Sequence, residues 1–276
     1  MIEKIRVQRW FELAEMSMFT AAEAYERNMG RWSKRLAPLF VQFVGVESGD
    51  RVLDVGCGTG SLTWEIVRTT AVSKIVGIDA SKSFLEYARS RYSDPRLTFE
   101  LGDAQKLTFA DASFDRCVSM LVMRHIPDAV KAASEMRRVT RPGGVVATVM
   151  WDNTGGHEIN QSLWDAAGTL DPQGEFPPEA ESYGSSDELR NLWVGAGLRN
   201  IEVKELSLRC EYSSFDEHWI PHIVEGQGIA AAYVKRLSED HRTALREQVR
   251  RNLFGDRADG PFTLQAKAWA VRGLVT

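Results

Sequence analysis

The residues best placed to do chemistry include three glycines that follow a short apolar run. Gly56, Gly58 and Gly60 come directly after the run at 52–55, and a helical segment starts at once behind them. Glycines permit a sharp turn and leave room for a ligand against the main chain. The start of the next helix adds free N–H groups and the positive end of a dipole. The pattern therefore predicts a ligand-binding loop between a strand and a helix.

Two acids follow the next two apolar runs. Asp79 ends the run at 75–78, about 20 residues beyond the glycines, where doubly wound nucleotide-binding folds accept hydrogen bonds from ribose hydroxyls. Alternatively, Asp79 or Ser81 could be the N-cap of the next helix, and the two roles of Asp79 are compatible. Asp103 stands between Gly102 and Ala104. It could accept a hydrogen bond from an exocyclic amine, with the Ala104 N–H near a ring nitrogen, or form an Asx turn at a strand end.

A sheet must bring these residues together. Between Arg51 and Val149, short apolar runs alternate with helical segments, which predicts parallel strands joined by crossover helices. The carboxyl ends of such strands meet at one edge, where open α/β folds bind ligands. The predicted strands are 52–55, 74–78, 97–100, 114–119 and 145–149, and the predicted helices are 61–68, 83–91 and 130–140.

The flanking segments have a different character. Apolar residues up to about Val44 recur every three or four positions, which indicates helices. Residues 152–186 are rich in Gly, Pro, Asn and Asp and predict a long, partly ordered excursion. Beyond it we expect a helix at 187–196, a strand at 201–209, helices over 215–253 and a last strand at 262–271.

Composition limits the function classes. The chain has 276 residues, 43% hydrophobic and 26% charged, with a net charge of −4 and no basic block that would attract nucleic acid. The first residues carry charges throughout, so we expect neither a signal peptide nor a membrane span. Cys57, Cys117 and Cys210 lie far apart and form no metal-ligand pattern. We expect a cytoplasmic protein without a metal site or a membrane partner; the oligomeric state is left open.

Five motifs make the chain similar to the class I S-adenosylmethionine-dependent methyltransferases. The similarity is to the small-molecule kind that includes the ubiquinone and menaquinone biosynthesis methyltransferases. The motifs are VLDVGCGTG at 52–60, VGID at 76–79, GDA at 102–104, FADASFD at 109–115 and RPGG at 141–144.

This resemblance implies an α/β fold with a Rossmann-like, doubly wound sheet, mostly parallel, with the antiparallel last strand inside it. It implies S-adenosylmethionine as the cofactor, with the glycine loop on the methionine side, Asp79 at the ribose and Asp103 with Ala104 at the adenine. The RPGG motif would form the turn into the fifth strand. The implied binding residues in this core are Asp54, Gly56, Cys57, Gly58, Gly60, Asp79, Ala80, Asp103, Ala104 and Ser119.

The resemblance also suggests a division of the chain. Residues 1–45 would be an N-terminal helical cap, 46–210 the cofactor-binding domain, 211–258 a helical insertion that covers the substrate, and 259–276 the strand that completes the sheet. In the cap, the segment from Tyr25 to Ser33 resembles one that closes over the cofactor. Tyr25 and Arg31 could approach the methionine end, with Arg31 pairing with its carboxylate, or be a packing Tyr and a surface Arg.

Methyl transfer from a sulfonium is a direct displacement, so positioning and exclusion of water are the main contributions of the protein. A general base is needed only if the acceptor must lose a proton. His125 follows the fourth predicted strand and could be that base, or it could support the loop beside the cofactor. His157, His218 and His222 could line a substrate pocket, or be solvent-exposed.

Three other functions are compatible with parts of the pattern. A nicotinamide-dependent oxidoreductase would normally show Gly-x-Gly-x-x-Gly, but here the third glycine comes one residue early and Ser61 follows it. A binding module without turnover would keep the same loop and acids. A protein or RNA methyltransferase often carries an Asn-Pro-Pro-Tyr-like tetrapeptide after the fourth strand, and residues 121–124 depart from it. We therefore expect a small-molecule acceptor.

Overall fold

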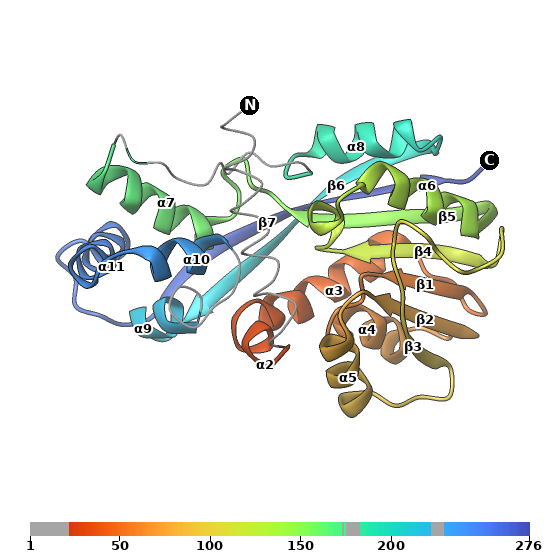
Figure 1. The fold of residues 1–276 in the computed structure, drawn as a ribbon, viewed down its shortest axis with the longest axis horizontal. Helices are drawn as coiled ribbons and strands as arrows, with labels where there is room; N and C mark the ends of the chain where they lie inside the picture. Colours follow the sequence, from red (N-terminus) through yellow and green to blue (C-terminus); the bar gives the residue numbers. More distant parts are fainter. Residues whose placement is uncertain (1–21, 173, 175–182, 222–228) are drawn as a thin grey trace.

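The computed structural model describes residues 22–172, 174, 183–221 and 229–276 (Figure 1). They form a seven-stranded sheet in the order β3-β2-β1-β4-β5-β7-β6. The strands are β1 (Arg51–Val55), β2 (Lys74–Asp79), β3 (Leu97–Leu101), β4 (Phe114–Met120), β5 (Thr140–Trp151), β6 (Arg199–Tyr212) and β7 (Phe262–Leu274).

The sheet has the topology that the sequence predicts. β1 to β5 pair in parallel, while β7 lies between β5 and β6 and is antiparallel to both. The carboxyl ends of β1, β2 and β4 therefore meet at one edge, with the glycine loop directly after β1. This confirms the mostly parallel α/β sheet with an antiparallel last strand.

Helices cover both faces of this sheet. One face carries α3 (Arg31–Val44), α4 (Ser61–Thr69) and α5 (Lys82–Arg91), and the other carries α6 (Ala129–Val139) and α8 (Ser186–Gly195). The chain enters α3 through α2 (Ala22–Tyr25) and the π-helix η1 (Glu26–Gly30). The fold is thus doubly wound, and the first described helices lie on the same face as the helix that follows the glycine loop.

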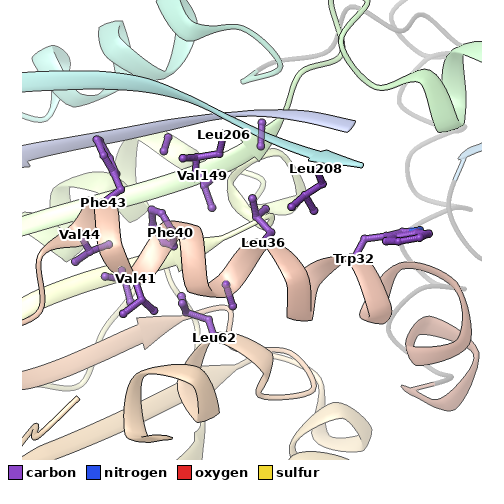
Figure 2. Packing of buried hydrophobic residues seen from close by; sticks show 14 of the residues in the cluster. Trp32, Leu36, Phe40, Val41, Phe43, Val44, Leu62, Val149, Leu206 and Leu208 are labelled. Carbon is purple, nitrogen blue, oxygen red and sulfur yellow. The ribbon is translucent and has the colours of Figure 1, made fainter. Parts of the chain in front are cut away.

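The packing of α3 explains why the N-terminal helices belong to the core. Leu36 and Phe40 are fully buried and point from α3 toward the sheet, where they meet side chains such as Val149 and Leu206 (Figure 2). Their spacing of four places both on one side of the helix. The helix ends at Gly45, whose φ of 70° is one that glycine adopts at low cost.

β6 and β7 extend beyond the rest of the sheet. β5 pairs with β7 as far as Ala268, whereas β6 continues along β7 to Phe262. Four helices with a shared apolar cluster surround this extension: α7 (Glu158–Leu170), α9 (Phe215–Trp219), α10 (Ile229–Arg236) and α11 (Glu239–Phe254) (Figure 1). The sequence predicts a loose excursion over 152–186, and this is wrong for α7, which is a helix of 13 residues.

The RPGG motif also differs from expectation, because it belongs to β5 and is not a separate turn. β5 begins at Thr140, and its pairing with β4 shifts register between Phe114 and Arg116. Gly143 has a φ of 76°, and its N–H donates to the carbonyl of Val275 at 2.8 Å. The motif therefore forms an irregular strand start that is anchored on both sides.

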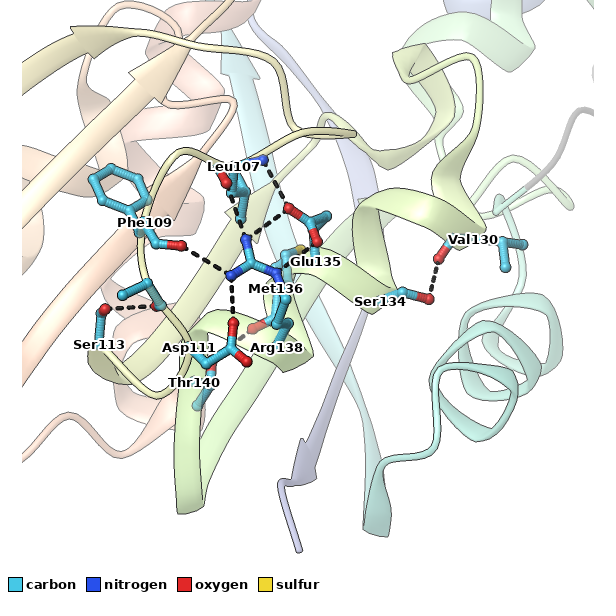
Figure 3. Close-up of polar contacts among 11 residues, drawn as sticks. Leu107, Phe109, Asp111, Ser113, Val130, Ser134, Glu135, Met136, Arg138 and Thr140 are labelled. Carbon is cyan, nitrogen blue, oxygen red and sulfur yellow. Dashed lines mark hydrogen bonds and ion pairs between the residues drawn. The ribbon is translucent and has the colours of Figure 1, made fainter.

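An arginine on α6 fixes the connection from β3 to β4. The Arg138 guanidinium donates to the carbonyls of Leu107 and Phe109, each at 2.9 Å, and to the carboxylate of Asp111 at 2.7 Å (Figure 3). Glu135 binds the same guanidinium and accepts from the Leu107 N–H at 2.9 Å. This network positions the segment that follows Asp103 and Ala104.

The described residues contain neither a candidate membrane span nor a candidate metal site. Within them, no helix combines the length and the apolar character needed to span a membrane. The same residues contain no cluster of three or more His, Cys, Asp or Glu side chains arranged to bind a metal ion.

Candidate functional site

The glycine loop is anchored to the neighbouring strand by its own backbone. The N–H groups of Gly56 and Cys57 both donate to the carbonyl of Ile78 on β2, at 2.8 and 2.9 Å. Gly56, Gly58 and Gly60 have φ values of 72°, 54° and 87°. All three positions lie in the left-handed region that favours glycine, so the loop needs these residue types for its shape.

Gly56 is required for a second reason. A Cβ atom at this position would lie 2.6 Å from the Val122 side chain, in the segment that follows β4. The glycine loop and the segment after β4 therefore pack directly against each other. This contact brings the carboxyl ends of β1 and β4 together as the sequence predicts.

Asp79 connects β2 to the glycine loop. Its buried carboxylate accepts one hydrogen bond from the Gly58 N–H and another from the Ser81 N–H, both at 2.8 Å. Burial raises the pKa of Asp79, and the two N–H donors oppose that shift. The N-cap of α5 is Ser81, whose hydroxyl accepts from the Phe84 N–H. Asp79 thus contacts the loop and the helix cap without being the cap itself.

Asp54 is the second buried acid at this edge, with a relative exposure of 1%. One carboxylate oxygen accepts a hydrogen bond of 2.6 Å from the Thr63 hydroxyl on α4. The other oxygen has no hydrogen-bond partner among the described residues. Burial, with a contribution from the charge of Asp79, raises the pKa of Asp54 to about 7, although the bond from Thr63 opposes the shift.

Buried hydroxyl groups lie near the same edge. Ser119 on β4 and Thr148 on β5 are register partners, both fully buried, and neither hydroxyl oxygen has a partner within the described part of the chain. The hydroxyl of Ser61, at the start of α4, is likewise buried without a partner there. Buried polar groups normally have partners, so these are candidates for contact with a ligand or water.

The predicted adenine end is more open. Asp103 is exposed and accepts two hydrogen bonds from Gln105, one from its N–H at 2.8 Å and one from its side chain at 3.1 Å. These bonds lower the pKa of Asp103. They form the Asx-type turn that the sequence left open. Ala104 packs against the core, and Ala80 is exposed directly after Asp79.

Tyr25 reaches the site from the N-terminal side. Its hydroxyl forms a hydrogen bond of 2.9 Å with Ser33, and its ring lies 5.6 Å from the ring of Phe84 on α5. Burial raises the pKa of Tyr25 to about 12, and the nearby charges of Glu26 and Asp79 add to the shift. Tyr25 therefore lies beside the ribose end of the predicted site as a neutral phenol.

Arg31 is already paired with another residue of the chain. Its guanidinium forms an ion pair of 2.8 Å with Glu217 on α9. It also lies over two rings, 4.2 Å from the centre of Trp32 and 4.7 Å from that of Tyr212. A ligand carboxylate that contacts Arg31 would therefore share the positive charge of the guanidinium with Glu217.

Sequence reasoning missed Glu26. Its carboxylate accepts a hydrogen bond of 2.5 Å from the Thr59 hydroxyl in the glycine loop, and it also binds the ammonium group of Lys34. The contact depends on the π-helix η1, a rare element that no local pattern announced. It fastens the N-terminal segment directly to the predicted cofactor loop.

The histidines differ from the sequence-based expectations in their pKa or in their burial. His125 ends a short 3₁₀ helix after β4, and burial together with the charge of Arg124 lowers its pKa to about 3. His157 and His218 are 3% and 0% exposed, so the expectation of solvent-exposed side chains is wrong for both. His222 lies outside the described residues.

Comparison with known proteins agrees with this geometry. Residues 53–148 match the family described as methyltransferase domain. The ubiquinone/menaquinone biosynthesis C-methyltransferase of Bdellovibrio bacteriovorus is 40% identical over 117 residues, which cover 42% of this chain and 48% of that protein. Residues 53–148 of the chain therefore form a methyltransferase domain.

Solved structures share the architecture of this methyltransferase domain and its flanking parts. The YcgJ protein from Bacillus subtilis has a TM-score of 0.58 at 21% identity, covering 87% of this chain and 97% of its own. A Haemonchus contortus phosphoethanolamine N-methyltransferase 2, in complex with phosphomonomethylethanolamine and S-adenosylhomocysteine, has a TM-score of 0.57 at 17% identity, covering 94% of this chain and 58% of its own. At these identities the likeness concerns the fold.

The extent of the sequence match separates two parts of the chain. Its alignments span about half the length of the curated relatives and the methyltransferase domain ends near the carboxyl end of β5. Tyr25, Glu26 and Arg31 lie before the matched residues, and α7 to α11 lie after them. The matched domain thus contains the glycine loop and both buried acids, and the helices around the β6–β7 extension lie outside it.

Proposed function

We propose that this chain transfers a methyl group from S-adenosylmethionine to a small-molecule acceptor. The observation that carries the proposal is the pair of buried acids beside the glycine loop. Asp79 fixes the loop through Gly58, and Asp54 presents a carboxylate oxygen that has no partner among the described residues. An acid in this state suits a ligand with a positive charge and several hydrogen-bond donors.

The residues present fit this cofactor, which supplies a methyl group on a positively charged sulfur when bound. The glycine loop and Asp54 would hold its methionine side, Asp79 with Ala80 its ribose, and Asp103 with Ala104 its adenine. Ser119 offers a buried hydroxyl beneath the site. These groups bind and orient, and alignment of donor and acceptor is the largest contribution that a protein makes to a direct displacement.

The acceptor side is proposed to lie between the carboxyl edge of the sheet and the helices around the β6–β7 extension. Trp32, Trp151 and Tyr212 are buried aromatic residues of the apolar cluster that reaches this region. Aromatic side chains of this kind favour an apolar or aromatic acceptor. The similarity to a ubiquinone/menaquinone biosynthesis methyltransferase supports a small-molecule acceptor. We also propose that the protein is cytoplasmic and that the chain divides into the four segments 1–45, 46–210, 211–258 and 259–276.

Two other functions would give different experimental results. A nicotinamide oxidoreductase is disfavoured because the chain carries a methyltransferase domain. A binding module without turnover would hold the cofactor but transfer nothing. The intact loop and acids are expected in both an active enzyme and such a module, so only turnover separates them.

Calorimetry with S-adenosylmethionine, S-adenosylhomocysteine and NAD tests the cofactor. We expect binding of the first two and none of NAD; binding of NAD alone would refute the proposal. A panel of small-molecule acceptors with a radiolabelled methyl donor then tests turnover. Transfer to a quinol, phenol or other small acceptor supports the enzyme, whereas binding with no transfer across a broad panel would favour the binding module.

A further inference from the structure

We propose that Tyr212 is a specificity-determining residue of the acceptor site, where its hydroxyl donates a hydrogen bond to a neutral carbonyl oxygen of the methyl acceptor. The inference rests on the proposed function and names a chemical group that the acceptor carries. Tyr212 is the last residue of β6. It belongs to the apolar cluster that includes buried residues of α3, together with Trp151 at the carboxyl end of β5.

The hydroxyl of Tyr212 is buried without a partner. The residue is 3% exposed, and its hydroxyl oxygen forms no hydrogen bond with any described residue. A buried polar group that stays unpaired lowers the stability of the fold, and most such groups in proteins have a partner. The hydroxyl of Tyr212 is therefore a candidate for contact with a ligand.

The ring of Tyr212 is held on several sides. It is stacked on the ring of Phe262, with 5.0 Å between the ring centres and 15° between the planes. Trp32 and His218 make edge contacts with it, at 5.5 and 5.0 Å between ring centres. Because a phenol oxygen lies in the plane of its ring, these contacts also fix the position of the hydroxyl. The aromatic surroundings suit a ligand whose body is apolar or aromatic.

Arg31 supplies a second donor beside the same ring. Its guanidinium carbon lies 4.7 Å from the centre of the Tyr212 ring, and its Nε is buried without a hydrogen-bond partner among the described residues. Burial raises the pKa of Tyr212, and the charge of Arg31 opposes this shift. The raised pKa keeps the phenol neutral, so its hydroxyl can donate. An O–H and an N–H donor suit one ligand oxygen that has two lone pairs.

The charges near Tyr212 are already balanced. Arg31 forms its ion pair of 2.8 Å with Glu217, and Arg35 lies 3.8 Å from Glu211. A carboxylate or phosphate of the acceptor would be repelled by Glu217, which shares the positive charge of Arg31. A neutral carbonyl oxygen accepts the same two hydrogen bonds without this repulsion. The arrangement therefore favours a carbonyl group over an anionic one.

The exposed side of this enclosure is the ion pair. The side chains of Arg31 and Glu217 are 30% and 35% exposed, whereas Tyr212, Trp32 and Phe215 are buried. A shift of the ion pair toward solvent would open a path to the Tyr212 hydroxyl.

Two small probes test the proposal on the protein saturated with S-adenosylhomocysteine. The probes are 1-indanone, an aromatic ketone, and indane, which has the same two rings without the oxygen. Ligand-observed NMR gives the dissociation constant of each probe. We expect Tyr212→Phe to weaken the binding of 1-indanone about fivefold, the effect of one hydrogen bond, and to leave the binding of indane unchanged.

A control variant and the stability of the free protein separate this role from a structural one. Tyr92→Phe is the matched control, because Tyr92 is also stacked on an aromatic ring, that of Trp64, but is only partly buried. It should leave the binding of both probes unchanged. Since the Tyr212 hydroxyl has no partner in the described structure, Tyr212→Phe should unfold at the same temperature as the wild type or at a higher one. A crystal structure of the wild type with 1-indanone should place the carbonyl oxygen within hydrogen-bond distance of Tyr212.

Several results would overturn the proposal. They are no binding of 1-indanone at millimolar concentration, unchanged binding in Tyr212→Phe, and equal weakening of both probes, which would make the role of Tyr212 one of packing. A crystal structure with only water at the hydroxyl and the probe elsewhere would do the same, and it needs no variant. All of these results leave the proposed function intact. Failure of the wild type to bind S-adenosylhomocysteine, measured in the same samples, would instead refute the proposed function.

Discussion

Arg31 on α3 and Glu217 on α9 form an ion pair of 2.8 Å although 186 positions separate them in the sequence. The N-terminal segment that carries Arg31 also contacts the glycine loop, through the bond between Glu26 and Thr59. This N-terminal segment thus contacts both the predicted donor site and α9, one of the helices between β6 and β7.

This pair gives the first prediction, which concerns donor affinity. If Arg31 binds the carboxylate of the donor, two carboxylates share the charge of one guanidinium, and Glu217 repels the donor carboxylate. Glu217→Gln should then tighten S-adenosylmethionine binding several-fold, while Arg31→Ala should weaken it by about tenfold, which is about 1.4 kcal/mol. Calorimetry on both variants measures this. Unchanged affinity in both would place Arg31 outside the donor site and leave it as a contact to α9.

The stability of the two variants provides the control. Both partners are about one-third exposed, so loss of the pair alone should cost about 0.2–1 kcal/mol. Arg31→Ala should cost more than Glu217→Gln, because it also removes the guanidinium from the rings of Trp32 and Tyr212. The backbone N–H and the hydroxyl of Ser213, and then the ion pair with Arg31, lower the pKa of Glu217 against the opposing effect of burial. Its stabilisation is therefore present above the ordinary pKa of 4.5 and is lost as the pH falls through the lowered value.

The second prediction concerns Asp79. Asp79→Asn removes the charge and can accept only one of the two N–H groups, from Gly58 and Ser81, that the carboxylate now accepts. Hydrogen bonds to charged groups are worth about 1.5–3 kcal/mol, so donor affinity should fall roughly ten- to a hundredfold with the fold intact. Asp103→Asn is the matched control, because that carboxylate is exposed and its loss should cost less. Equal affinity of wild type and Asp79→Asn would remove Asp79 from the ribose site.

The third prediction separates two requirements for glycine at position 56. Gly56→Ala should lose stability both from its φ of 72° and from the contact with Val122 at 2.6 Å. Gly49→Ala is a matched control, because Gly49 also has a positive φ, 87°, but nothing lies within 4 Å of an added Cβ. It should lose only about 1–2 kcal/mol. Thermal unfolding should show the larger loss for Gly56→Ala, with partial recovery in Gly56→Ala/Val122→Ala. If the two single variants lose the same stability, the close contact makes no contribution.

The sequence predicted the parallel sheet well because β1, β2 and β4 are short, mostly buried runs, and a helix marks the crossovers from β1 to β2, from β2 to β3 and from β4 to β5. The sequence also predicted that the glycine loop and Asp79 lie at the same edge of the sheet, because the order and direction of parallel strands fix where their carboxyl ends meet. The helix α7 was missed because glycines and polar residues flank it. Its Ile159, Leu163 and Ala166 are nonetheless spaced as one helical face, and that signal could have found it.

Other features depend on contacts that no local pattern contains. The bond from Thr59 to Glu26 requires a π-helix to cross the glycine loop, and the pairing of Arg31 with Glu217 joins distant parts of the chain. The pKa of His125 likewise depends on how deeply the segment after β4 is buried. Sequence spacing gives the position of a residue along an element, whereas burial and partners arise from the tertiary fold.

The last prediction concerns His125. From the sequence, an imidazole acting as a base would give a limb near pH 6.5 in the pH–rate profile. In the structure, burial and Arg124 lower the pKa of His125 to about 3, so the side chain is neutral throughout the range in which an enzyme assay is run. Such a weak base is poorly matched to an acceptor proton, because acid–base catalysis is most effective when the pKa lies near the working pH. We therefore expect no imidazole limb between pH 5 and pH 8 in the wild type.

Stability measurements distinguish a supporting role from a catalytic one. Between pH 6.5 and about pH 3 the unfolded chain binds a proton on His125 that the folded chain excludes, so wild-type stability should fall as the pH is lowered through that window. The slope from this one group is at most about 1.4 kcal/mol per pH unit, and His125→Asn should lack it. If His125 supports the loop, turnover, donor affinity and stability should decline together in this variant. A stable His125→Asn that binds the donor normally but turns over about 10²–10⁴ times more slowly would instead make His125 the general base.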